Sequence, residues 1–177
     1  MSDSISYLRN WFLEKHIKIR NDWLTQCVDH FKSQARNISL NDLRDQTYHQ
    51  WLLNDIADSS IRCFPEINAT TKILSGNFTL QIQTLIDISI PAYSQLEQIY
   101  NLPQEKLEEE FEQEKSSRVL KLVLTDGTKT INAIEYRPIK SLSLNIDPGC
   151  KITLKGPIKV SFNGILYLEE HNVHILG

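Results

Sequence analysis

Few residues in this 177-residue chain have the types and spacing that catalysis or metal binding requires. His171 and His174 form a His-x-x-His pair beside Glu169 and Glu170. In the strand predicted at this end of the chain, residues three apart point to opposite faces, so shared metal ligation is awkward. We therefore predict no metal site and no cofactor.

The cysteines and glycines show no catalytic pattern either. Cys27, Cys63 and Cys150 are scattered and lack Cys-x-x-Cys spacing, which argues against a zinc site and a disulfide framework and favours a reducing compartment. None of the six glycines falls in a phosphate-binding pattern. With no catalytic residue to nominate, we predict that the protein is not an enzyme.

Contact with single-stranded nucleic acid requires basic side chains near the phosphates and aromatic rings near the bases. Arg118, Lys121, Lys129 and Tyr136 lie in or beside two predicted strands and are candidates for this contact. Tyr136 is the only aromatic residue among the outward positions of these strands, so they lack a stacking platform. We expect weak contact with the phosphate backbone rather than tight binding.

The composition and charge exclude several classes of protein. Hydrophobic residues make up 41% and charged residues 23% of the chain, which is ordinary for a globular protein. No apolar run approaches the ~20 residues of a membrane-spanning helix, and the first residues lack a signal-peptide pattern. A net charge of −3 argues against a strongly basic nucleic-acid binder.

The charge is unevenly distributed along the chain. Residues 1–75 are neutral overall, residues 76–118 carry a net charge of −5, and residues 119–177 carry +2. The acidity is concentrated in six residues: Glu105, Glu108, Glu109, Glu110, Glu112 and Glu114. Such a run is solvated and packs poorly, so we expect a loop or a free helical face.

The elements that must hold the candidate residues follow from the hydrophobic periodicity. The N-terminal region predicts three amphipathic helices, with Asp22 and Ser39 as caps of the second and third. One tryptophan falls in each helix (Trp11, Trp23 and Trp51), and we expect all three to anchor the core of a small bundle.

After Gly76 the apolar period changes to two, which predicts five principal strands, at residues 78–90, 118–124, 129–136, 151–160 and 165–168. Asp126-Gly127 between two strand-like runs indicates a hairpin, and Arg137-Pro138 ends the second run. This number and order of strands is that of an OB-fold. We predict an α+β protein: a three-helix bundle, then a five-stranded OB-fold barrel with a long insertion between strands one and two. The predicted parts are residues 1–62 (bundle), 63–75 (linker) and 76–177 (barrel, with the insertion at 91–117).

The insertion is longer than a small barrel requires, and such loops are usually functional or disordered. Its first half is apolar and aromatic and is the predicted partner-binding segment: Pro91, Ala92, Tyr93, Ser94, Gln95, Leu96, Ile99 and Tyr100. Leu96, Ile99 and Tyr100 have the i, i+3, i+4 spacing of helical anchors that enter a partner's groove. The same residues could equally pack on the barrel itself.

An ordered set of short motifs resembles the N-terminal region of the RecQ-mediated genome instability scaffold family. The motifs are Trp23-Leu24-x-x-Cys27-Val28, Gln50-Trp51-Leu52-Leu53-x-Asp55, Leu80-Gln81-Ile82 through Asp87-Ile88-Ser89, Pro91-Ala92-Tyr93-Ser94-Gln95, Leu124-Thr125-Asp126-Gly127, Glu135-Tyr136, Pro148-Gly149 and Val173-x-Ile175-Leu176-Gly177. The resemblance runs from about Trp11 to Gly177. A related tudor-domain protein shares the barrel motifs but lacks the Gln-Trp-Leu-Leu and Pro-Ala-Tyr-Ser-Gln motifs.

The resemblance implies a non-catalytic nuclear subunit that binds topoisomerase III and a RecQ-family helicase. In that family the insertion enters the gate of the topoisomerase, and the complex dissolves double Holliday junctions in DNA repair, replication and homologous recombination. Its implied counterpart here is residues 91–117, of which the Glu-rich second half matches no family motif. Because vertebrate members carry a second OB domain, we expect either a short form or a fragment. The alternative function is an OB-fold protein that binds single-stranded DNA without an enzyme partner.

Overall fold

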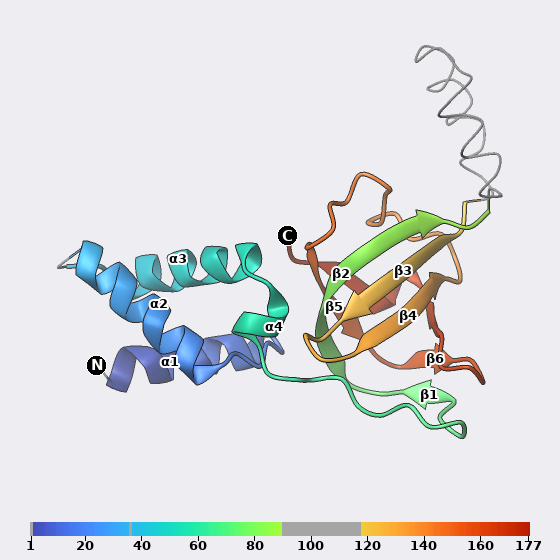
Figure 1. Ribbon diagram of the computed structural model, residues 1–177, viewed down its shortest axis with the longest axis horizontal. Helices are drawn as coiled ribbons and strands as arrows, with labels where there is room; N and C mark the ends of the chain where they lie inside the picture. Colours follow the sequence, from blue (N-terminus) through green and yellow to red (C-terminus); the bar gives the residue numbers. More distant parts are fainter. Residues whose placement is uncertain (1, 36, 90–117) are drawn as a thin grey trace, which may run out of the picture.

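The computed structural model describes residues 2–35, 37–89 and 118–177. A helical part and a curled β-sheet lie side by side (Figure 1). The helices are α1 (Ser2–Glu14), α2 (Asn21–Gln34), α3 (Leu40–Leu53) and the short α4 (Ile56–Ser59). Within the described ranges, no helix has the length and apolar character needed to cross a membrane.

Local side-chain hydrogen bonds define where the helices begin. The Ser39 hydroxyl accepts a hydrogen bond from the Asp42 amide at 3.1 Å, which confirms the predicted cap of α3. The predicted cap of α2 is wrong, because that helix begins at Asn21 and its N-cap is Arg20. Asp22 instead lies in the first turn, where the positive end of the helix dipole stabilises a carboxylate.

The helices bury one apolar core. Trp51 is fully buried at its centre and donates a hydrogen bond from Nε1 to the Ser60 hydroxyl at 3.0 Å. Trp11 and Trp23 are half-buried and pack against the edge of the same core. The prediction of a tryptophan anchor is therefore confirmed most fully for α3.

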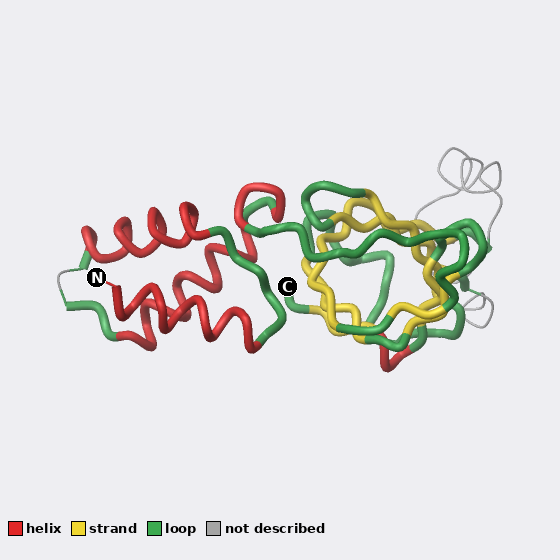
Figure 2. The backbone as a smooth tube through the Cα atoms, turned by 90° about the horizontal axis from the view of Figure 1, so that it is seen from below, coloured by secondary structure: helices red, strands yellow, loops and turns green. Residues whose placement is uncertain are grey.

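The described residues of the second part form one sheet of eight strands. The strands are β1 (Ile73–Leu74), β2 (Asn77–Asp87), β3 (Leu120–Thr125), β4 (Thr130–Glu135), β5 (Lys151–Lys155), β6 (Ile158–Val160), β7 (Leu166–Leu168) and β8 (Val173–Ile175). Their order is β1-β6-β7-β4-β3-β2-β5-β8, and Figure 2 shows the strands curled around a common core. β3 and β4 form the hairpin that Asp126-Gly127 predicts.

The predicted strand 151–160 is divided into β5 and β6, and two predicted linker residues form β1. The two strand pairs share one register, since Leu74 pairs with Ile158 and Asn77 pairs with Lys155. The segment from β1 to β2 and the segment from β5 to β6 therefore bend together, and this bend closes the sheet. Glycine is needed at this point because a Cβ on Gly156 would lie 2.7 Å from the carbonyl oxygen of Leu74.

The helical part covers the outside of β2 and β5. The Thr79 hydroxyl donates to the carbonyl oxygen of His16 at 3.2 Å, and the Ile56 amide donates to Oε1 of Gln81 at 2.7 Å. Because of this cover, Thr79 and Thr153 are buried although they point away from the sheet's own core. Within the described residues, no α-helix lies over the rest of the outer face, on β3, β4 and β6 (Figure 1).

Candidate functional site

The predicted partner-binding residues, Pro91 to Tyr100, lie outside the described residues. Hydrogen bonds hold the two points of the barrel that flank the insertion. The Ile88 amide donates to the carbonyl oxygen of Val119 at 2.9 Å. Oδ1 of Asp87 accepts hydrogen bonds from the Ser89 amide at 2.9 Å and the Val119 amide at 3.3 Å. These bonds hold the end of β2 and the start of β3 together, so the insertion starts and ends at one fixed point of the barrel.

Arg118, a predicted nucleic-acid contact, belongs to a partly buried ion pair beside that point. Its guanidinium donates to Oε1 of Glu135 at 2.9 Å, and the Glu135 side chain is only 1% exposed. The same carboxylate accepts the amides of Leu120 at 3.1 Å and Ile139 at 2.6 Å. The pair therefore ties together β3, β4 and the segment that follows β4.

Lys129 lies at the other end of the β3–β4 hairpin, next to the helical part. Its ammonium group pairs with Glu66, which also pairs with Arg62. Tyr136 follows β4, whereas Lys129 precedes it, so the length of the strand separates the two. The structure does not bring Lys129 together with the other three predicted residues.

Lys121 and Tyr136 do share the uncovered outer face, and the fold adds a second tyrosine beside them. Tyr167 on β7 lies next to Tyr136, with ring centroids 5.5 Å apart and ring planes inclined by 47°. Nζ of Lys159 on β6 lies 5.7 Å from the centroid of the Tyr136 ring. Sequence reasoning missed Tyr167 because it depends on the parallel pairing of β4 with β7, which no local pattern indicates.

Lys121, Tyr167 and Lys159 belong to a continuous row across six strands, which we call the outer row. Register partners follow one another in the order Ile73, Lys159, Tyr167, Ile134, Lys121 and Ile86. Their neighbours along each strand are mostly buried in the barrel core, so the row points outward. The outer row is apolar, aromatic and basic, and it contains no acidic residue.

A cavity of about 240 Å³ adjoins the outer row at β6 and β7. The residues that line it include Lys159, Tyr167, Glu169, His171 and Asn172. The predicted His-x-x-His pair is divided here, because His171 lies in a 3-10 helix (Glu170–Asn172) and His174 lies on β8. The parts of the chain that the structure describes contain no group of three residues able to hold a metal ion.

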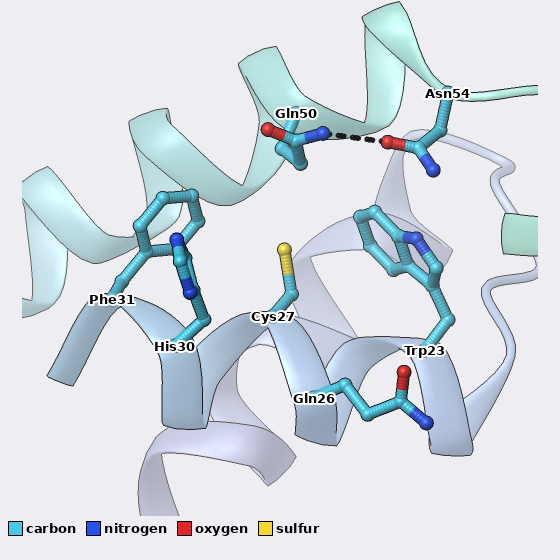
Figure 3. Close-up of a pocket in the computed structure, with 7 residues that line it drawn as sticks. All are labelled: Trp23, Gln26, Cys27, His30, Phe31, Gln50 and Asn54. Atoms are coloured by element: carbon cyan, nitrogen blue, oxygen red, sulfur yellow. Dashed lines mark hydrogen bonds between the residues drawn. The ribbon is translucent and has the colours of Figure 1, made fainter. Parts of the chain in front are cut away.

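A second groove, also of about 240 Å³, lies between α2 and α3 (Figure 3). Trp23, Cys27 and Phe31 come from successive turns of α2, with the Cys27 sulfur between the two rings (Figure 3). Gln50 donates to Asn54 at 2.7 Å on the α3 side. Burial raises the pKa of the Cys27 thiol to about 11, so this sulfur is a weak nucleophile at neutral pH.

Comparison with known protein families agrees with both parts of the fold. The sequence profile of "RMI1, N-terminal OB-fold domain" matches residues 54–177. The profile of "RMI1, N-terminal helical domain" matches residues 12–59. The chain belongs to the RMI1 family. The resemblance noted from the sequence motifs is thereby confirmed, and so is an OB-fold joined to a helical part.

Individual relatives of the RMI1 family align along most of the chain. RecQ-mediated genome instability protein 1 of Xenopus laevis is 34% identical over 96% of this chain and 32% of its own length. The Danio rerio protein of that name is 36% identical over 93% of this chain and 34% of its own length. Tudor domain-containing protein 3 of Xenopus tropicalis is 40% identical over 79% of this chain and 16% of its own length. The chain thus spans about a third of the length of these two RecQ-mediated genome instability proteins.

Proposed function

We propose that this chain is a non-catalytic scaffold of genome maintenance that binds topoisomerase III and a RecQ-family helicase in the nucleus. In this role it stimulates decatenation and the dissolution of double Holliday junctions. Membership of the RMI1 family supports the proposal, since its members carry the name RecQ-mediated genome instability protein 1. An OB-fold is consistent with a binding role, because this fold is widely used for binding oligonucleotides and oligosaccharides.

The observation that carries the proposal is the fixed point from which the insertion leaves the barrel. Because Asp87 and the Ile88–Val119 hydrogen bond hold both ends, residues 91–117 can contact a partner without any change in the barrel. Ile86 and Ile88 are 43% and 47% exposed beside this point and extend the apolar surface available to the partner. A segment that binds the open gate of a topoisomerase better than the closed gate shifts the population toward the open state.

Deleting residues 94–115 tests this proposal. The hydrogen bonds at the ends of β2 and β3 remain, so we expect the variant to fold and to bind topoisomerase III, but to stimulate decatenation poorly. The measurements are co-purification with topoisomerase III and a decatenation assay with purified proteins. Full stimulation by the deletion variant would contradict the proposal.

A matched variant separates the length of the insertion from its charge. Replacing the six glutamates of the acidic run by glutamine keeps the length and the apolar first half. If the apolar half carries the function, this variant stimulates decatenation as well as the unmodified chain does. Loss of stimulation in the glutamine variant would instead assign the contact to the acidic half.

A further inference from the structure

Three exposed lysines lie along the junction between the helical part and the barrel. They are Lys15, Lys18 and Lys155, and we call them the basic seam. Lys15 and Lys18 follow α1, whose end reaches the junction (Figure 1), and Lys155 is the last residue of β5. Residues 1–75 are neutral overall, so this local excess of positive charge comes from the fold rather than from the composition.

Contacts of His16 bring the end of α1 to Lys155. The side-chain amide of Asn77 hydrogen-bonds to Nε2 of His16 at 2.8 Å, and Asn77 is the register partner of Lys155 across β2 and β5. Register partners on neighbouring strands point to the same face of a sheet. Lys155 therefore lies on the face that His16 contacts, one residue along the chain from Lys15.

Lys18 reaches the same place through the segment that follows α4. Its carbonyl oxygen accepts the Ile61 amide at 2.6 Å. Burial raises the pKa of the Cys63 thiol to about 11, and the charge of Lys18 opposes this rise, so the ammonium group lies near Cys63. The Cys63 sulfur donates to the carbonyl oxygen of Thr79 at 3.2 Å, two residues beyond Asn77 on β2.

The backbone at His16 holds this corner in a fixed shape. Its φ is 63°, and among the described residues it is the only residue other than glycine with a positive φ. The amides of His16 and Ile17 donate to the carbonyl oxygens of Leu13 and Phe12 at 2.9 Å each. A strained conformation persists where the surrounding contacts determine it. The basic seam is therefore preformed, which lowers the entropic cost of binding a ligand.

The lysines of the basic seam have no acidic partner within the described residues, where the ion pairs involve other basic side chains. Asp126, whose charge also acts on Cys63, is buried and accepts backbone amides. Lys15 lies against Trp11, with its ammonium nitrogen 4.9 Å from the ring centroid. Glu14 is exposed beside Lys15 in the sequence, so the seam retains an excess of positive charge.

We propose that the basic seam binds an acidic, extended segment of a protein partner, with carboxylates next to Lys15, Lys18 and Lys155. In an extended segment, alternate side chains point to one face at intervals of about 6.6 Å, so successive carboxylates reach separate ammonium groups. A protein segment is favoured over a nucleic acid because Trp11, the ring beside the seam, is half-buried and already contacts Lys15. The proposal does not depend on topoisomerase binding.

A model peptide tests the proposal with the full chain alone. The probe is a fluorescent peptide of about 12 residues in which glutamate alternates with serine, which extends to about 40 Å. Binding is measured by fluorescence anisotropy at about 50 and 200 mM salt, because exposed ion pairs weaken with ionic strength. We expect binding at the lower salt concentration, and none by a peptide with glutamine in place of glutamate. Equal binding of the two peptides, or binding of neither, would overturn the proposal.

Replacing all three lysines of the basic seam by methionine tests the position of the site. Each exposed ion pair contributes a factor of about 1.4 to 5, so we expect the glutamate peptide to bind about 3- to 150-fold more weakly. The three side chains are exposed, so the variant should fold, which circular dichroism can verify. Arginine at the same three positions keeps the charges and should preserve binding. Arginine and methionine variants that bind equally would contradict the charge contacts.

A matched control separates the basic seam from the overall charge. Methionine at Lys121, Arg137 and Lys140 removes the same number of charges elsewhere on the barrel. Lys121 pairs with Ile86, at the other end of β2 from Asn77, and the other two residues follow β4. We expect nearly unchanged binding of the glutamate peptide, and equal weakening by the two methionine variants would overturn the proposal.

An oligothymidylate of about 12 nucleotides provides the last comparison, since it covers the site of a single OB-fold. We expect it to displace the glutamate peptide from the unmodified chain only weakly. Tighter binding of the oligothymidylate than of the peptide, lost in the methionine variant of the basic seam, would overturn the proposal and make the seam a nucleic-acid site instead.

Discussion

At the scale of single residues, Lys151 is a charged group buried between the two parts of the fold. It is fully buried, and its ammonium group donates to the carbonyl oxygens of Leu52 at 2.9 Å and Asn54 at 2.6 Å. These carbonyls belong to the C-terminal end of α3, where unpaired oxygens and the helix dipole favour a cation. The ammonium group also lies 5.2 Å from the centroid of the Trp51 ring. One barrel side chain thus completes the end of a bundle helix.

We predict that Lys151→Met lowers the free energy of unfolding at pH 7 by about 1–3 kcal/mol, because two buried carbonyls lose their donor. The difference from the unmodified chain should grow at alkaline pH. Burial lowers the pKa of Lys151 from 10.5 to about 8. Between these values the unfolded chain binds more protons than the folded chain, so stability of the unmodified chain rises with pH, by at most about 1.4 kcal/mol per pH unit.

Urea unfolding of both proteins at several pH values between neutral and alkaline checks this prediction. Comparing the two proteins removes the contribution of the other titrating groups. A constant difference across the window would show that Lys151 keeps its ordinary pKa in the folded chain.

At the scale of elements, the β3–β4 hairpin turn is a docking point as well as a connection. Oδ2 of Asp126 accepts the Phe64 amide at 3.0 Å, and Oδ1 accepts the amides of Thr128 and Lys129 at 3.0 Å each. Burial opposes ionisation of this carboxyl, but the hydrogen bonds outweigh it and lower its pKa. The turn thereby fixes the segment that connects α4 to the sheet.

Gly127 is the residue that lets this turn approach α4. Its φ is +91°, and a Cβ there would lie 2.7 Å from Cα of Ala57. We predict that Gly127→Ala lowers the free energy of unfolding by about 2–5 kcal/mol, the sum of left-handed strain and a backbone clash. The measurement is the urea concentration at the midpoint of unfolding, which should fall while the dependence of the free energy of unfolding on urea concentration stays the same.

Gly164→Ala is the matched control for the clash. Gly164 also has a positive φ, of +81°, but its nearest neighbour would be a methyl carbon of Ile67 at 3.9 Å. We expect only the strain, about 1–2 kcal/mol. Equal losses in the two variants would mean that contact between the turn and α4 adds nothing to stability.

The elements themselves were largely predictable, because each depends on a local signal. The period-two pattern predicts β3 and β4, and Asp126-Gly127 predicts their turn, within one or two residues of the observed ends. The cap of α2 was predicted wrongly at Asp22, because a carboxylate is favourable both at the N-cap and in the first turn of a helix. The division of the strand at Gly156 was missed, because only the approach of the Leu74 carbonyl across the sheet requires glycine there.

At the scale of the whole molecule, the helical part and the barrel share buried contacts at several points. Lys151 joins α3 to β5, Gln81 joins α4 to β2, and Gly127 places the hairpin against α4. Leu176, near the end of the sequence, packs against the core of the helical part. These contacts are distributed along the interface, so separating the parts would leave many buried polar groups without partners.

We predict that the helical part and the barrel unfold in one cooperative transition. All three tryptophans lie in the helical part, so their fluorescence reports its unfolding. Hydrogen exchange of buried β3 and β4 amides, such as those of Leu122 and Ala133, reports the barrel. Both probes should give the same free energy of unfolding in urea. A lower value from fluorescence would show that the helical part unfolds first.

The sequence by itself determined the class of the protein: an amphipathic helical region, an OB-type series of strands, an acidic insertion and a set of motifs that lead to the RMI1 family. These features are local or ordered along the chain, so they can be read without distances. Only the tertiary structure decided which candidate side chains meet. The parallel pairing of β4 with β7 places Tyr167 beside Tyr136, while folding pairs Arg118 with Glu135 and Lys129 with Glu66. Such pairings join residues distant in sequence and depend on the closure of the whole sheet, which no local pattern specifies.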